Sequence, residues 1–167
     1  MGEMNVFGLP VVEESVSAVT LTPSIQLGTR RIHNGEEYVY MYNSGGGTIS
    51  VGNGVKPITA ASGYSVAATS LTDVFSPCFG VVKHVAMATL EYGWVMTRGF
   101  TTVVVVSDTT GNFVPLALST AGKFRSVSLT ANTDIAFGGT GLVDAGFALN
   151  ANTAAGGSVY AFIKANC

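Results

Sequence analysis

The stretch Tyr38-Val39-Tyr40-Met41-Tyr42 decides the fold class, because it places apolar side chains on both faces of one extended strand. Side chains alternate between the faces of a β-strand, so the tyrosines share one face while Val39 and Met41 share the other. Residues 102–106 have the same two-sided apolar character. In an antiparallel sheet of this size, both faces cannot belong to one core. We therefore expect the second face to meet another layer or another subunit, and we expect the chain to oligomerise or dock.

Short strands separated by glycine-rich turns are expected over the rest of the chain. Glycine occurs 21 times in 167 residues and gathers in clusters that include 44–47, 52–54, 108–112, 121–123, 138–141 and 150–157. The runs between the clusters are rich in Val, Thr, Tyr, Phe and Ile, and residues 126–130 alternate hydroxyl and apolar side chains. Helical signals are nearly absent, and strands at this spacing indicate a sandwich or barrel. We predict one all-β domain over residues 27–167, an antiparallel β-barrel or jelly-roll-like sandwich.

Residues 1–26 have a different character. They contain Pro10 and Pro23, the acidic pair Glu13-Glu14 and a loosely alternating stretch at 15–21. Proline is confined to edge strands and strand starts, so we predict an extended N-terminal arm or an edge strand. Either one suits contact with a neighbour by strand addition. A partly frayed terminus is the alternative.

The composition excludes several classes of protein. Hydrophobic residues make up 47% and charged residues 11%, which excludes a disordered chain. The net charge of −2 leaves no surplus of cations for nucleic acid, and no apolar run approaches the roughly 20 residues of a membrane-spanning helix. The first residues show no secretory signal, so we expect synthesis in a cytosol. Cys78 and Cys167 could pair, but a reducing cytoplasm favours two thiols.

Few residues suggest chemistry. His33 and His84 are far apart in sequence, and we expect a solvated turn for His33 and a strand position for His84. Cys78 lies six residues before His84 with no second pair to complete a metal site. Glu36 and Glu37 are adjacent and point to opposite strand faces, so they cannot act together on one substrate. We predict no catalytic, cofactor-binding or metal-binding residues, no cofactor and no enzyme activity.

Three familiar motifs are incomplete. The chain has no Gly-x-Ser-x-Gly elbow for a nucleophilic serine. Ala121-Gly122-Lys123-Phe124 departs from a phosphate loop, because Ala117 stands where glycine is needed and Phe124 replaces Ser or Thr. The glycines at 138–141 do not form a dinucleotide fingerprint and are expected to be turn residues with positive φ.

Tyr92 and Trp94 fall on one strand face, with Gly93 between them on the other. Two aromatic rings on one face could stack on a carbohydrate. The other interpretation, which we favour, is a buried aromatic pair beside a glycine that admits close backbone packing.

Several runs resemble small virion proteins of tailed bacteriophages that are encoded among the head genes. The resemblance is carried by Leu27-Gly28-Thr29-Arg30-Arg31, by 35–43 and 51–55, by Tyr92-Gly93-Trp94-Val95 with the following residues to 103, and by Gly111-Asn112 and Ala121-Gly122. It extends from about Leu27 to Lys123 and fades toward the C-terminus. The motifs are moderately specific as a set and weak singly.

The resemblance implies a capsid decoration (cement) protein, typically an all-β trimer on the outer surface of the shell. The expected partners are other copies of the chain, as a homotrimer, and the major capsid protein, with no nucleic acid and no membrane. The expected location is the virion, after synthesis in the host cytoplasm. The alternatives are a head-fibre or tail component and a carbohydrate-binding β module such as an adhesin, the latter motivated by Tyr92, Trp94 and the tyrosine row. A small trimeric all-β enzyme has the least support.

Overall fold

The protein is built from short β-strands around one long one. The computed structural model describes residues 15–23, 25–58, 64–67, 78–106, 112–126, 145–151 and 157–165. The strands are β1 (Val19–Thr20), β2 (Arg30–His33), β3 (Glu36–Asn43), β4 (Gly54–Pro57), β5 (Ser65–Ala67), β6 (Gly80–Val81), β7 (Tyr92–Val104), β8 (Pro115–Leu118), β9 (Phe124–Ser126), β10 (Gly146–Ala148) and β11 (Ser158–Lys164). The only helical element in these ranges is the short 3-10 turn Thr120–Gly122, and no described helix has the length and apolar character needed to cross a membrane. The all-β prediction is confirmed.

Five strands close into a barrel in the order β3, β5, β4, β6 and β7, with β7 pairing back onto β3. The pairing of β3 with β5 is parallel, whereas the prediction was an antiparallel barrel or sandwich. Val39 and Met41 point to the core of this barrel with Val95 of β7. The other buried members of that core are Ile49, Val55, Val66, Val82 and Met87. This core therefore accounts for one of the two apolar faces of β3.

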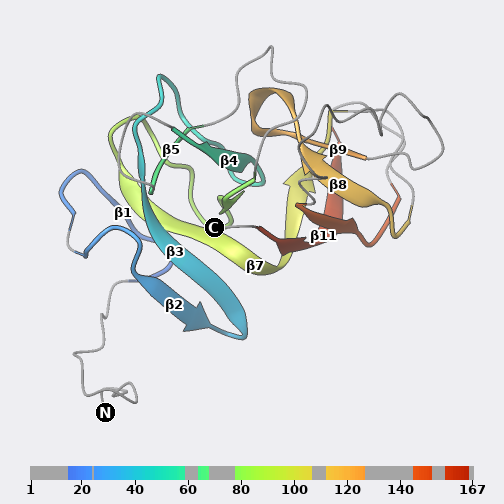
Figure 1. Cartoon of the computed structure of the whole chain (residues 1–167), viewed down its shortest axis with the longest axis horizontal. Helices are drawn as coiled ribbons and strands as arrows, with labels where there is room; N and C mark the ends of the chain where they lie inside the picture. The colour runs from blue at the N-terminus through green and yellow to red at the C-terminus, as the bar shows by residue number, and fades with distance from the viewer. Residues whose placement is uncertain are drawn as a thin grey trace, which may run out of the picture.

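The long strand β7 continues into a second ring of strands (Figure 1). There β7 pairs with β11, which is followed by β10, β8 and β9. A parallel bridge between Val105 and Phe124 brings β9 back beside the end of β7. The interior holds buried side chains from every strand of the ring, among them Val103, Leu116, Phe124, Ala148 and Ile163. The two rings thus share one strand.

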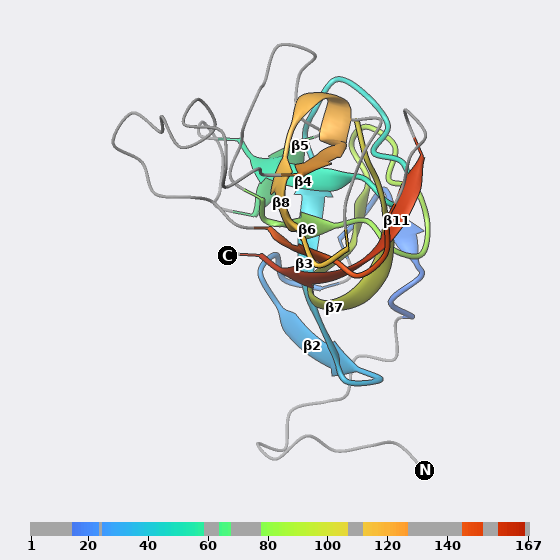
Figure 2. The same cartoon turned by 90° about the vertical axis from the view of Figure 1, so that its right-hand side faces the viewer.

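The β2–β3 hairpin projects from the first barrel (Figures 1 and 2). Its turn is Asn34-Gly35, with φ of 52° and 79°. Positive φ at both central residues is typical of a type I′ turn, for which Asn-Gly is the favoured sequence. The hairpin keeps Arg31 opposite Tyr38 and His33 opposite Glu36.

The N-terminal segment covers the tyrosine face of β3. β1 pairs with the start of β7, which places Val19 opposite Gly93. Val16 is buried in the same core as Tyr38 and Tyr40, and Ile25 and Leu27 pack against this core. The Thr20 and Tyr40 hydroxyl oxygens are 3.3 Å apart. Over residues 15–23, the segment predicted as an arm or an edge strand is therefore a packed layer that contains a short strand; residues 1–14 lie outside the description.

The two apolar faces of β3 do not require a second subunit to cover them. Tyr38, Val39, Tyr40 and Met41 are each at most 1% exposed within a single chain. We expected the second apolar face of β3 to meet either another layer or another subunit. It meets another layer, and that layer belongs to the same chain. Residues 102–106 differ, because Val103 and Val105 are buried in the second ring while Thr102 on the other face is exposed and Val104 and Val106 are half-buried. The covered faces of β3 therefore supply no reason for a second subunit.

Candidate functional site

A group of aromatic side chains lies on the outer surface of the second ring. Phe100 of β7, Phe162 of β11 and Phe147 of β10 are directly opposed in register on three neighbouring strands. Tyr160 of β11 lies two residues from Phe162 on the same face. We call these four residues the aromatic face.

Strand alternation explains why these rings point outward. On β11, Val159, Ala161 and Ile163 are buried in the core, so the residues between them face away from it. Phe100 is 46% exposed, Phe147 43% and Tyr160 48%, while Phe162 between them is partly buried.

The rings form one contiguous surface. The Phe100 and Tyr160 rings are nearly parallel, at an interplanar angle of 14° and a centroid distance of 6.1 Å. The Phe100 and Phe162 rings are tilted by 55° at 5.0 Å. Cross-strand aromatic pairs stabilise a sheet, but they do not need this much exposure. Contiguous exposed apolar surface on a soluble protein marks a site of interaction.

Charged and hydroxyl residues border the aromatic face. Arg98 and Lys164 are opposite each other at one end, and both are exposed. Thr102 lies opposite Tyr160 toward the other end. A polar rim around an apolar centre is the usual anatomy of a protein interface.

A polar cluster connects the aromatic face to the β2–β3 hairpin. Lys83 donates from Nζ to Glu36 Oε1 at 2.5 Å and to the carbonyl oxygen of Phe100 at 2.9 Å. The Tyr38 hydroxyl donates to Glu36 Oε2 at 2.5 Å. Because its only proton is used there, His84 Nε2, 2.9 Å away, is the donor to the hydroxyl oxygen. The Tyr38 and His84 rings stack at 5.7 Å.

Burial and the neighbouring groups shift three pKa values in this cluster. Burial raises the pKa of Glu36, but the hydrogen bonds from Lys83 and Tyr38 and the nearby positive charges together lower it by more. The pKa of Glu36 is therefore below its usual value. Burial and the hydrogen bond to Glu36 raise the pKa of Tyr38. Burial and the charge of Lys83 lower the pKa of His84.

These pKa values suit a structural role for the cluster. The Tyr38 phenol stays protonated, since both its burial and its carboxylate partner disfavour the phenolate. The Glu36 carboxylate already accepts two hydrogen bonds, so it is a weak proton acceptor. The cluster therefore fixes the backbone at Phe100 relative to the hairpin.

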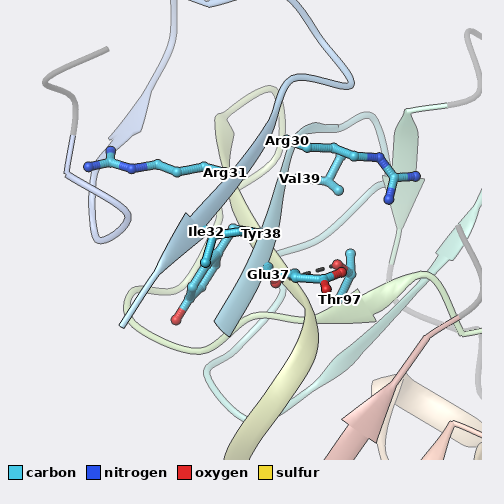
Figure 3. Close-up of a pocket in the computed structure, with 7 residues that line it drawn as sticks. All are labelled: Arg30, Arg31, Ile32, Glu37, Tyr38, Val39 and Thr97. Carbon is cyan, nitrogen blue, oxygen red and sulfur yellow. Dashed lines mark hydrogen bonds between the residues drawn. The ribbon is translucent and has the colours of Figure 1, made fainter. Parts of the chain in front are cut away.

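A cavity of about 240 Å³ lies at the base of the hairpin (Figure 3). Its lining includes Arg30, Arg31, Glu37, Tyr38 and Thr97. Arg30 and Arg31 leave the hairpin in opposite directions, so they do not converge on one anion. Arg98 pairs with Glu37 at 3.3 Å on the exposed side.

The sequence-predicted candidates have mixed outcomes. Trp94 is 4% exposed and packs edge-on against Tyr40 at 5.3 Å, while Tyr92 stacks on Tyr42 at 4.5 Å. Trp94 is buried, as the favoured interpretation expects, whereas Tyr92 is half-buried. Burial of Trp94, Tyr38 and Tyr40 rules out a sugar platform on these three rings. Gly93 is buried between Val19 and Met87, as expected of a glycine that admits close packing.

The two histidines are closer to each other than their sequence positions suggest. His33 ends β2 and precedes the turn, and its charge contributes to lowering the pKa of His84. The strand position predicted for His84 is wrong, because it lies in a bend after β6. Glu36 and Glu37 lie on opposite faces, as predicted. They pair with Lys83 and Arg98 respectively, which the sequence did not indicate.

The remaining candidates are structural or lie outside the description. The buried Cys78 thiol donates to the Gly80 carbonyl oxygen at 3.5 Å, and Cys167 and residues 138–141 are outside the described ranges. Within those ranges no group of three His, Cys, Asp or Glu side chains could hold a metal ion. Ala121 and Gly122 form a tight turn with positive φ.

Sequence reasoning missed the aromatic face. Its members come from three strands, and the run Gly99-Phe100-Thr101-Thr102 gives no sign that the phenylalanine is exposed while Thr101 is buried. The alternation of Ser158 to Lys164 is the one available signal, because its small apolar positions alternate with Tyr160 and Phe162.

Comparison of the chain with protein-family models, curated proteins and solved structures finds no match.

Proposed function

We propose that this protein is a non-enzymatic virion structural protein, a decoration (cement) protein that binds the outside of a tailed-phage head and stabilises the shell. The aromatic face carries the proposal, since it offers an exposed apolar surface on a closed β-structure. The resemblance of residues 27–123 to small virion proteins supports the choice of partner, the major capsid protein.

Decoration requires rigidity and weak contacts used many times. Each copy would bury a modest apolar area, and a homotrimer would make several such contacts at once, which raises the overall affinity. Binding only the expanded shell would stabilise that state by mass action. The trimer rests on the resemblance alone, because both apolar faces of β3 are covered within one chain. Light scattering on the purified protein tests it, and a stable monomer at micromolar concentration would contradict it.

Co-sedimentation with expanded shells tests the role. The shells are assembled from the major capsid protein encoded in the same genome. We expect the unmodified protein to sediment with them and the double variant Phe100→Ser/Phe147→Ser to remain in the supernatant. Ile32→Ser is the matched control, since Ile32 is 75% exposed on the hairpin and lies outside the aromatic face. Binding by the double variant would overturn this docking surface, and no binding by the unmodified protein would overturn the role.

A carbohydrate-binding module is the second candidate. The nearly parallel Phe100 and Tyr160 rings favour it, because flat exposed rings stack on sugars. A glycan array discriminates between the two: binding that is lost in Tyr160→Ala supports the module, and no signal across the array removes it.

A further inference from the structure

One end of the aromatic face is cationic. Lys164 and Arg98 are paired in register on β11 and β7, one step from Phe162 and Phe100. Arg98 contacts Glu37 at 3.3 Å, with both side chains largely exposed, and an exposed pair of this kind is weak. Lys164 has no ion-pair partner among the residues that the structure describes. A partner on this surface would therefore meet positive charge beside the phenylalanines.

Among the described residues, the rest of the rim supplies no negative charge to balance these cations. Thr102 and Ser158 supply hydroxyl groups toward the other end of β7 and β11. The described carboxylates nearest to the face, Glu36 and Glu37, are already engaged by Lys83 and Arg98. The aromatic face is therefore apolar in the centre, positively charged at the end with Arg98 and Lys164, and uncharged at the end with Thr102 and Ser158.

A second copy of the same surface fits poorly. If two copies met with their strands aligned, Lys164 and Arg98 of one would meet the same cations of the other. If they met head to tail, each cationic end would meet Thr102 and Ser158, which carry no negative charge. Like charges in an interface disfavour association, and buried unpaired charges cost free energy.

We propose that the aromatic face docks an acidic apolar protein segment, in which bulky apolar side chains cover Phe100, Phe147 and Phe162 and a following carboxylate reaches Lys164. Apolar burial supplies most of the affinity, and the carboxylate fixes the direction in which the segment lies. This inference rests on the proposed function, in which the aromatic face docks on the shell. It adds the chemistry of the partner, since the shell must then present an acidic apolar segment.

Two short synthetic peptides serve as probes. Both alternate phenylalanine or leucine with serine, and one ends in a run of aspartates while the other ends in a run of lysines. Fluorescence anisotropy with labelled peptides measures their affinity for the full chain. We expect the aspartate peptide to bind about tenfold or more tightly than the lysine peptide, with a difference that shrinks at high salt.

Variants identify the surface. We expect Phe162→Ser to remove binding of both peptides, and Lys164→Glu to remove or reverse the preference between them. Arg30→Glu makes the same charge change at an exposed position on β2, and we expect it to keep the preference. Thermal unfolding of each variant shows that the fold is retained.

The outcomes separate this inference from the proposed function. Equal binding of the two peptides, or no binding of either at millimolar concentration, overturns the acidic partner even if the protein still sediments with shells. Selective binding of the aspartate peptide without sedimentation overturns the decoration role and leaves the partner chemistry standing.

Discussion

Val19 lies directly opposite Gly93, and a β-carbon added to Gly93 would be 3.1 Å from Val19 Cγ1. It would also be 3.3 Å from Met87 Sδ on the same side. The bare backbone of Gly93 is therefore what allows β1 to lie so close to β7. Val19 packs there against the core that holds Val39 and Met41, whereas Val16 of the same segment is buried with the tyrosines on the other face.

Gly93→Ala should destabilise the protein by about 1–3 kcal/mol, because the new methyl group overpacks the contact between β1 and β7. Chemical denaturation measures the change. Gly47→Ala is the control, since no atom lies within 4 Å of the added carbon there. Equal stability of the two variants would show that β1 moves aside at no cost.

Deletion of residues 1–21 should lower the unfolding midpoint and expose apolar surface. The deletion removes β1 and the buried Val16, and it takes away the Thr20 side chain that lies beside the Tyr40 hydroxyl. Thermal unfolding with binding of an apolar dye measures both effects. Val16→Ser in the full chain should act in the same direction but more weakly. An unchanged midpoint after deletion would show that the segment is a dispensable arm.

Trp94→Ala should cost about 3–5 kcal/mol, because it removes a large buried ring that packs against Tyr40. Trp94→Phe should cost much less, since the indole Nε1 has no hydrogen-bond partner among the described residues and none is lost. Denaturant titration of the two variants gives the comparison. Equal losses would show that the indole nitrogen makes a bond that matters.

Acidification should destabilise the fold in two steps. His84 faces Lys83, Glu36 and His33, and its pKa in the folded protein is below the usual value of 6.5, so the unfolded chain binds the proton more tightly. Stability should therefore decrease as the pH falls below about 6.5, and the decrease should stop once the pH is below the folded pKa. Glu36 has a folded pKa below 4.5, so the stability it contributes is present above that pH and is lost as the pH falls through the folded value.

Unfolding midpoints measured across this pH range test the assignment. His84→Asn should remove the first step and keep the second, while Glu36→Gln should flatten the second. His33→Asn is the comparison, because His33 is a neighbour of His84 whose ring Nε2 lies 3.2 Å from Asn34 Nδ2, whereas His84 hydrogen-bonds Tyr38. If His84→Asn leaves the first step in place, another group is responsible for it.

The fold class could be read from local patterns, whereas the layering could not. Alternation in residues 38–42 correctly predicts a strand with two apolar faces, since it depends only on the geometry of one strand. Which segment covers each face depends on pairing between residues far apart, such as Val19 with Gly93. The Asn34-Gly35 turn was available in the sequence as a hairpin signal and identifies β2.

The aromatic face could not be predicted from local sequence patterns, for a similar reason. Phe100, Phe147 and Phe162 are neighbours only because β7, β11 and β10 pair in one register. A one-residue slip of β11 would turn Tyr160 and Phe162 inward. Tyr92 and Trp94 attracted attention as adjacent aromatics, yet Trp94 is buried against Tyr40 and Tyr92 is half-buried against the same core.

The shared strand β7 has a mechanical consequence. Residues 92–96 of β7 belong to the first barrel and residues 97–104 belong to the second ring. Force or heat that opens either ring must therefore break hydrogen bonds made by this one strand. Because the two rings share β7, loss of one ring should weaken the other, and we expect the molecule to unfold in a single cooperative transition. A load applied to the aromatic face would then be carried through β7 to both rings.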